Sequence, residues 1–213
     1  MGWSPRRYSC LIEGLIFVAY VGWYIWQGQA LLPATWWVFV VWLGASFLLR
    51  RDTPKTMGWR GDNLWAATRR ALVFFATASV AVTGAGLFLG MLQRSSAHLS
   101  EPKKFASYFA FCVLQQVGLN SFLMNRLLGA FGKPLPAALL AGVLFAALHW
   151  PNPVLVPLTF VGGSVMAWLF ARERNILPLA LGQAILGALV WWAFPMTWHH
   201  SMRVGPGYLT FGR

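Results

Sequence analysis

Long apolar runs alternate with short polar segments along the whole chain. A helix that crosses a membrane needs about 20 predominantly apolar residues, because each residue advances the helix by about 1.5 Å. Seven runs fit this description, the second, fifth and sixth being the shortest, and they cover approximately residues 10–31, 34–49, 71–92, 104–125, 136–150, 154–171 and 176–198. The pattern predicts an all-α, polytopic membrane bundle of about seven transmembrane helices.

The composition points to the same class of protein. Of the 213 residues, 58% are hydrophobic and only 10% are charged, which exceeds the apolar content that a soluble domain can bury. No internal repeat or change of composition divides the chain, so we expect a single integral membrane domain over residues 1–213. Its candidate chemistry lies within about 104–198. The remaining segment, 199–213, is polar and glycine-rich, and we expect a loosely ordered tail.

The charge pattern bears on topology rather than on nucleic acid. The formal net charge is +12, but the basic residues fall between the apolar runs instead of forming one continuous face, so we expect no nucleic-acid partner. With seven spans and a cytoplasmic N-terminus, twelve Lys and Arg residues fall inside and five outside, namely Arg94, Lys103, Lys104, Arg203 and Arg213. This asymmetry predicts a cytoplasmic N-terminus and an external C-terminus. The basic segment 50–70 is expected to anchor the chain at the inner surface.

Five uncharged polar residues interrupt the later apolar runs. Gln115, Gln116 and Asn120 lie in the fourth run, His149 ends the fifth, and Gln183 lies in the seventh among small residues. Gln116 and Asn120 share one helical face, whereas Gln115 points about 100° away from it. Such groups commonly join membrane helices through hydrogen bonds worth about 1 kcal/mol each, but they also mark binding sites inside a bundle. Both interpretations remain open at this stage.

Metal and cofactor sites are not indicated. Cys10 and Cys112 lie far apart in or beside apolar segments and predict neither a disulfide framework nor a metal site. His149 with amide oxygens is a poor zinc ligand set, and His199 and His200 form an adjacent pair near the far C-terminal end. We therefore expect no metal and no cofactor.

Three short motifs follow one another along the chain. QQVGLN begins at Gln115, FAALH ends at His149, and RNILPLALGQAILG contains Gln183 and Gly187. Their order and spacing resemble the CPBP family, the CAAX proteases and bacteriocin-processing enzymes, also called the Abi family of intramembrane glutamic proteases. That family carries E-E-x-x-x-R, F-x-x-x-H and H-x-x-x-N motifs on its membrane helices. The resemblance implies a CPBP-like helical fold in a bacterial inner (cytoplasmic) membrane.

The departures from the family motifs concern its catalytic groups. Gln115 and Gln116 stand at the two glutamate positions, Asn120 at the arginine position and Gln183 at a histidine position, so that His149 is the only titratable residue at the matched positions. In the family, a glutamate is thought to activate water as a general base. A carboxamide has no usable basicity and cannot take that role. We therefore do not expect peptide hydrolysis by the family's glutamate mechanism.

The leading hypothesis is a non-proteolytic binder. Gln116, Asn120, His149 and Gln183 would form a neutral pocket backed by Gln115, and the pocket would bind a hydrophobic ligand, a peptide or a membrane-protein partner in an immunity, assembly or stabilising role. One alternative is a membrane enzyme that acts on a lipid or isoprenoid substrate with His149 as acid or base. Another is an unusual CAAX-type endopeptidase. His149 is predicted nearer the outer boundary than the amides, so HWPNP must fold back at membrane depth or the fifth helix must extend further.

Overall fold

The computed structural model describes residues 4–93 and 101–212, and over these ranges the chain is helical with no strand. Arg94 and Arg213, which the topology count placed outside, lie beyond the described residues. The main helices are α1 (Pro5–Trp23), α2 (Gln29–Leu31), α3 (Trp37–Arg50), α4 (Pro54–Met57), α5 (Leu64–Phe88), α7 (Pro102–Gln116), α8 (Asn125–Phe131), α9 (Pro134–Ala147), α10 (Leu155–Glu173), α11 (Leu177–Ala193), α12 (Met196–His199) and α13 (Pro206–Leu209). Each of the seven apolar runs contains a helix, and the predicted all-α class is confirmed.

Several helix boundaries differ from the prediction. The third helix begins at Leu64 rather than near 71, because the basic segment that precedes the apolar run continues the same helix. The fourth continues from α7 through a π-helical segment, η3 (Val117–Met124), into α8, and so extends beyond residue 125. The fifth, α9, ends at Ala147. Helices therefore extend into the polar residues beside the apolar runs, and a count of apolar residues alone does not predict these extensions.

The outer surface of the bundle is apolar. Phe88 is 91% exposed, Leu49 84% and Val80 74%, and exposure of these apolar side chains to water would be unfavourable. Four helical stretches are long and apolar enough to cross a bilayer, Pro5–Leu31, Pro33–Arg50, Leu64–Phe88 and Leu155–Glu173, and α9 and α11 are shorter apolar helices. The chain is thus a multi-pass membrane protein whose exposed apolar side chains face lipid.

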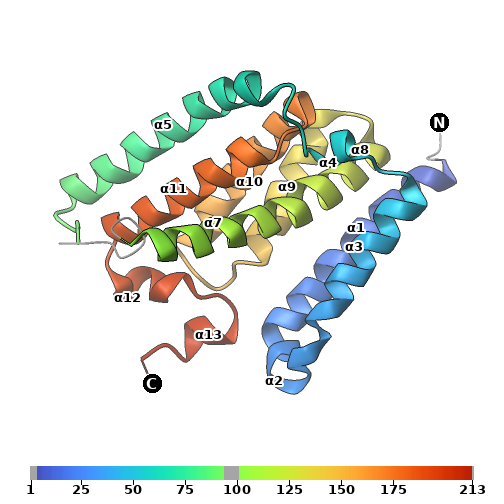
Figure 1. The fold of residues 1–213 in the computed structure, drawn as a ribbon. Coiled ribbons are helices and arrows are strands. Elements are labelled where there is room, and N and C mark those ends of the chain that lie inside the picture. The colour runs from blue at the N-terminus through green and yellow to red at the C-terminus, as the bar shows by residue number, and fades with distance from the viewer. Residues whose placement is uncertain (1–3, 94–100, 213) are drawn as a thin grey trace.

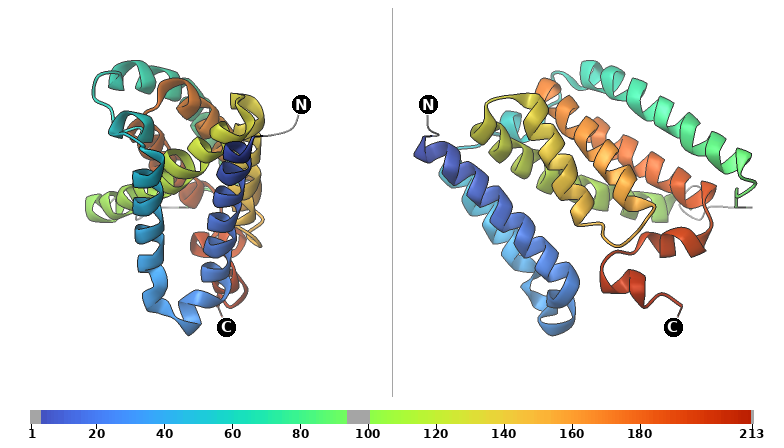
Figure 2. Two further views of the ribbon diagram at one scale, coloured as in Figure 1. Left: turned by 90° about the vertical axis from the view of Figure 1, so that its right-hand side faces the viewer. Right: turned by 180° about the vertical axis from the view of Figure 1, so that it is seen from behind.

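The helices form a central bundle with a hairpin at one side and α5 at the other (Figures 1 and 2). The hairpin of α1 and α3 contacts the bundle mainly through α1 and α8, whereas α5 lies along α11. Small residues allow the central helices to approach closely. A Cβ at Gly142 of α9 would overlap the hydroxyl of Ser164 on α10, and a Cβ at Gly182 of α11 would overlap the ring of Phe75 on α5.

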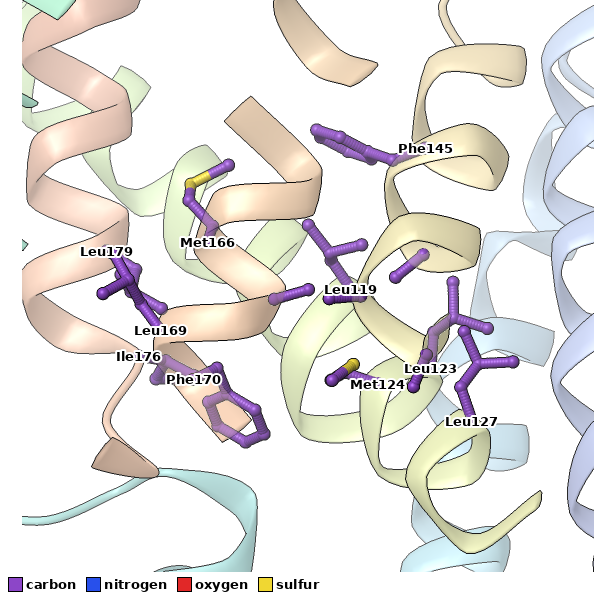
Figure 3. Close-up of a cluster of buried hydrophobic side chains, with 14 of the residues drawn as sticks. Leu119, Leu123, Met124, Leu127, Phe145, Met166, Leu169, Phe170, Ile176 and Leu179 are labelled. Carbon is purple, nitrogen blue, oxygen red and sulfur yellow. The ribbon is translucent and has the colours of Figure 1, made fainter. Parts of the chain in front are cut away.

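A large apolar cluster occupies the middle of the bundle. Figure 3 shows Leu119, Leu123, Met124 and Leu127 along η3 and α8 facing Phe145, Met166, Leu169, Phe170, Ile176 and Leu179 from the neighbouring helices. Phe122 and Phe170 are fully buried, and Phe122 lies 4.6 Å from Phe17 of α1, measured between ring centroids. The cluster therefore joins the hairpin to the bundle and holds η3 and α8 in a fixed position.

The basic segment after α3 is folded against the bundle. Gly58 has a φ of +92°, and its carbonyl accepts a hydrogen bond from the backbone N–H of Ile176 at 3.0 Å. Asn175 is 1% exposed and donates to the carbonyl of Arg60 at 2.8 Å. In the same segment, hydrogen bonding from Arg60 lowers the pKa of the exposed Asp62 carboxyl to about 2. Besides carrying basic charge, this segment therefore holds the loop between α10 and α11 in place through hydrogen bonds.

The C-terminal segment is ordered, contrary to the expectation of a loose tail. It forms α12, η4 (His200–Met202) and α13, and folds back over the turn after α9. The side-chain nitrogen of Asn152, a fully buried residue, donates to the carbonyls of His199 and Arg203, and the backbone N–H of Gly205 donates to the carbonyl of Trp150 at 2.9 Å. Polar, glycine-rich composition suggested a mobile tail because it carries no information about such long-range partners.

Candidate functional site

A chain of side-chain amides connects α7, η3 and α11. Asn120 Nδ2 donates to Gln116 Oε1, Gln116 Nε2 donates to Gln183 Oε1 at 2.6 Å, and Gln183 Nε2 donates to Gln115 Oε1 at 2.6 Å. Gln116 and Asn120 are 0% exposed, whereas Gln115 and Gln183 are half-buried. Four of the five polar residues singled out in the sequence therefore belong to one hydrogen-bonded network.

The fifth, His149, lies in the turn that ends α9. Its backbone N–H donates to the carbonyl of Ala146, and its imidazole Nδ1 lies 2.7 Å from the carbonyl oxygen of Phe145. A carbonyl only accepts hydrogen bonds, so Nδ1 carries the proton and Nε2 of the neutral ring is an acceptor. The ring also packs edge-on against Phe145 with 4.6 Å between centroids. The first and last residues of the FAALH motif thus fix one tautomer.

A cavity of about 180 Å³ brings these residues together. Its polar lining includes Gln115, Gln183, His149 and Thr159, and its apolar lining comes from α5, α7, α9, α10 and α11. Gln116 and Asn120 do not line it but lie behind Gln183. This arrangement reverses the expected order, in which Gln115 lay behind the other amides, because Gln183 reaches between the adjacent glutamines and bonds to both.

The position of His149 is explained by the fold of the HWPNP turn. The helix ends at Ala147, and the turn closes through the N–H of Asn152, which donates to the carbonyl of His149 at 3.0 Å. Met202 and Val204 of the C-terminal segment line the same cavity. Of the two arrangements considered from the sequence, the chain adopts the one that folds back, and protein covers it.

Tyr108 is a cavity residue that sequence reasoning missed. It lies on α7, lines the cavity and places its hydroxyl where a side chain at Gly187 would begin. Gly187 stands at the asparagine position of the H-x-x-x-N motif. A glycine at that position leaves room for a large side chain from a neighbouring helix. The sequence therefore contained a signal for a large neighbour at this position, but it did not identify Tyr108.

A second polar cluster, also missed, lies apart from the cavity. Glu13 of α1 pairs with Arg50 of α3 at 2.8 Å, and Arg126 of α8, which is 3% exposed, donates to Asp52 at 2.7 Å. Ser46 bridges Glu13 and Arg126. An acidic residue inside the first apolar run was the available signal. None of these residues lines the cavity, and we regard this ionic cluster as the connection between the hairpin and the bundle.

The residues at the cavity do not form a metal-binding set. In the part of the chain that the structure describes, no three His, Cys, Asp or Glu side chains come together in a way that could hold a metal ion. The charged groups of the ionic cluster are paired with one another. The polar groups available at the cavity are therefore two neutral amides, one imidazole, one phenol and the hydroxyl of Thr159.

Residues 104–189 match the family model described as type II CAAX prenyl endopeptidase Rce1-like. The match covers about two fifths of the chain and supports the resemblance to the CPBP family of CAAX-protease-like membrane proteins. The matched region includes all five polar residues and the cavity helices α7, α9, α10 and most of α11. No curated protein and no solved structure matches the chain. All three motifs lie within the matched residues.

Proposed function

We propose that this CAAX-protease-like protein binds a hydrophobic molecule in the membrane and does not hydrolyse peptides. The observation that carries the proposal is the hydrogen-bonded amide chain beside a mainly apolar cavity. Buried amides are costly unless paired, and here three hydrogen bonds join four amides, while Gln115, Gln183 and His149 line the cavity. An apolar pocket with a few convergent polar groups is typical of ligand sites.

The absence of a carboxylate from the described cavity lining argues against proteolysis by the family's glutamate mechanism. None of the described residues that line the cavity is Asp or Glu, and the two glutamate positions of the family carry Gln115 and Gln116. An amide cannot take the proton from an attacking water. The ligand we propose is a hydrophobic small molecule, and a peptide or a partner protein would need a larger opening than a cavity of about 180 Å³.

The same proposal includes the placement in the membrane. We infer an inner (cytoplasmic) membrane with the N-terminus on the cytoplasmic side and the C-terminus outside. Two observations support this orientation: the ends of the chain lie at opposite ends of the bundle (Figure 1), and Arg6, Arg51, Arg126 and Arg174 belong to segments at the same end as the N-terminus.

A direct test uses the purified protein in nanodiscs. We expect no cleavage of a prenylated CAAX-type peptide, and we expect native mass spectrometry to detect a retained hydrophobic molecule. Replacing the polar wall by Gln183→Leu should lower its occupancy, whereas Leu48→Ala, at a lipid-facing position of the hairpin that is 81% exposed, should not. Peptide cleavage that is lost in His149→Ala would overturn the proposal.

One observation favours a second candidate, an enzyme that acts on a lipid or isoprenoid. The hydrogen bond from His149 Nδ1 to Phe145 leaves Nε2 as a basic atom at the cavity. In that case a bound lipid would change chemically with time, and His149→Ala would stop the change. A ligand that stays chemically unchanged during prolonged incubation supports the binder.

A further inference from the structure

The amide chain has a direction, and it ends at the cavity in a donor. Each amide oxygen from Gln116 through Gln183 to Gln115 accepts from the amide before it. Gln115 Oε1 is used by Gln183, and Gln115 Nε2 donates to no described residue. Because Gln115 lines the cavity, this NH₂ group is a donor that the network offers to a ligand with both of its hydrogens.

Two contacts fix this direction. Gln116 Nε2 also donates to Met166 Sδ at 3.2 Å, and a reversed amide would turn its oxygen toward the sulfur, which has no hydrogen to give. At the buried end, Asn120 Oδ1 lacks a partner among the described residues. A reversed chain would put an NH₂ with two unpaired hydrogens in that place, and buried unpaired N–H groups are rarer than unpaired oxygens. The reverse orientation is therefore less stable at both points.

His149, which also lines the cavity, offers an acceptor. His149 Nδ1 carries its proton toward the carbonyl of Phe145, so that Nε2 has a free lone pair. The described lining residues include no Asp, Glu, Lys or Arg. An ion brought into such a cavity would lose its hydration without gaining a counter-ion, and this excludes charged head groups as stable occupants.

We propose that the ligand is a neutral long-chain alcohol whose hydroxyl oxygen accepts from Gln115 Nε2 and whose hydroxyl hydrogen is donated to His149 Nε2. A hydroxyl is the smallest neutral group that is donor and acceptor at one atom. This inference rests on the proposed binding function, and it assigns a head group and a chain to the same site.

The apolar chain has a path beyond the small cavity. Leu158 lines both the small cavity and an adjoining apolar one of about 670 Å³ between α5, the start of α10 and α12. The larger cavity is lined by Val82, Ala85, Val154 and other mainly apolar residues. A hydroxyl between Gln115 and His149 with its chain passing Leu158 would use the polar and the apolar cavity together.

The test compares ligands that differ only at the head group. Purified protein in nanodiscs is labelled with a diazirine-bearing analogue of decan-1-ol, and decan-1-ol, decyl methyl ether, decane, decanoate and decylamine compete at equal mole fraction in the bilayer. Each hydrogen bond is worth about 1 kcal/mol, so decan-1-ol should compete about fivefold to tenfold better than the ether, which cannot donate to His149. His149→Phe should remove this advantage, and His149→Gln, which keeps an acceptor, should retain part of it.

The outcomes separate the two proposals. Equal competition by alcohol, ether and alkane, or stronger competition by the carboxylate or the amine, overturns the hydroxyl inference while the binding function stands. If no compound of the series lowers the labelling, both the hydroxyl inference and the proposed binding function are wrong. The ligand series uses the unaltered protein and remains decisive if a variant does not fold, and Leu48→Ala on the far hairpin is the matched control for the variants.

Discussion

The hydroxyl of Tyr108 on α7 occupies the space next to Gly187 of α11, where a Cβ would overlap it. Gly187 therefore determines how closely α7 approaches α11 beside the cavity. With glycine at this position, the hydroxyl of Tyr108 fits beside α11, and Tyr108 forms part of the cavity wall.

Gly187→Ala should lower the free energy of unfolding by about 1–3 kcal/mol, because the added methyl group displaces Tyr108. Gly84→Ala is the matched control. It lies on α5 with no atom within 4 Å of its would-be Cβ, so it should be neutral or stabilise by up to about 1 kcal/mol. Thermal unfolding in detergent measures both. Recovery of stability in the double variant Gly187→Ala with Tyr108→Ala would confirm the contact. If Gly187→Ala and Gly84→Ala change the free energy of unfolding equally, the contact has no effect on stability.

Gln116→Leu should destabilise the protein more than Gln115→Leu. Loss of Gln116 leaves Asn120 Nδ2 and Gln183 Oε1 without their partners in a buried place, which costs about 1–3 kcal/mol. Loss of Gln115 affects one bond of Gln183 at the cavity wall, where water can replace it. Unfolding measurements on both variants give the order. A larger effect of Gln115→Leu would show that the network does not depend on its buried end.

Arg126→Met should lower the free energy of unfolding by about 3 kcal/mol, because Asp52 loses its buried partner and Ser46 loses a donor. Lys104→Met is the control. Its pair with Glu101 is about half exposed on both sides and should contribute little. Adding Asp52→Asn to Arg126→Met should restore part of the loss. If Arg126→Met and Lys104→Met have the same free energy of unfolding, the ionic cluster has no structural role.

The C-terminal segment should lose stability in acid. Burial lowers the pKa of His199 below its usual 6.5, the neighbouring His200 acts in the same direction, and the hydrogen bond to the carbonyl of Phe194 opposes them. The unfolded chain then binds the proton more readily than the folded one. The stabilisation is complete above about pH 6.5 and declines as the pH falls below it. Melting temperatures at about pH 7.5 and about pH 5.5 should differ more for the parent protein than for His199→Phe. An unchanged difference in the variant would refute this assignment.

The sequence could identify the polar residues but not their order around the cavity. Apolar runs of the right length predict the helices because span length depends on bilayer thickness alone. Gln115 faces the cavity while Gln116 lies behind it, and this choice depends on where α11 places Gln183. Tyr108 and the C-terminal segment were missed for the same reason. Their partners, Gly187 and Asn152, are set by packing between distant parts of the chain, and local composition does not encode such packing.

The ionic cluster also constrains how the protein enters the membrane. Glu13 and Arg50 belong to the hairpin and can pair as soon as both are made, whereas Arg126 is synthesised much later in the chain. The hairpin can therefore insert with Glu13 neutralised by Arg50 before the bundle is made. Its attachment is completed only when α8 arrives with a second arginine, so correct assembly of the first two helices depends on a residue near the middle of the chain.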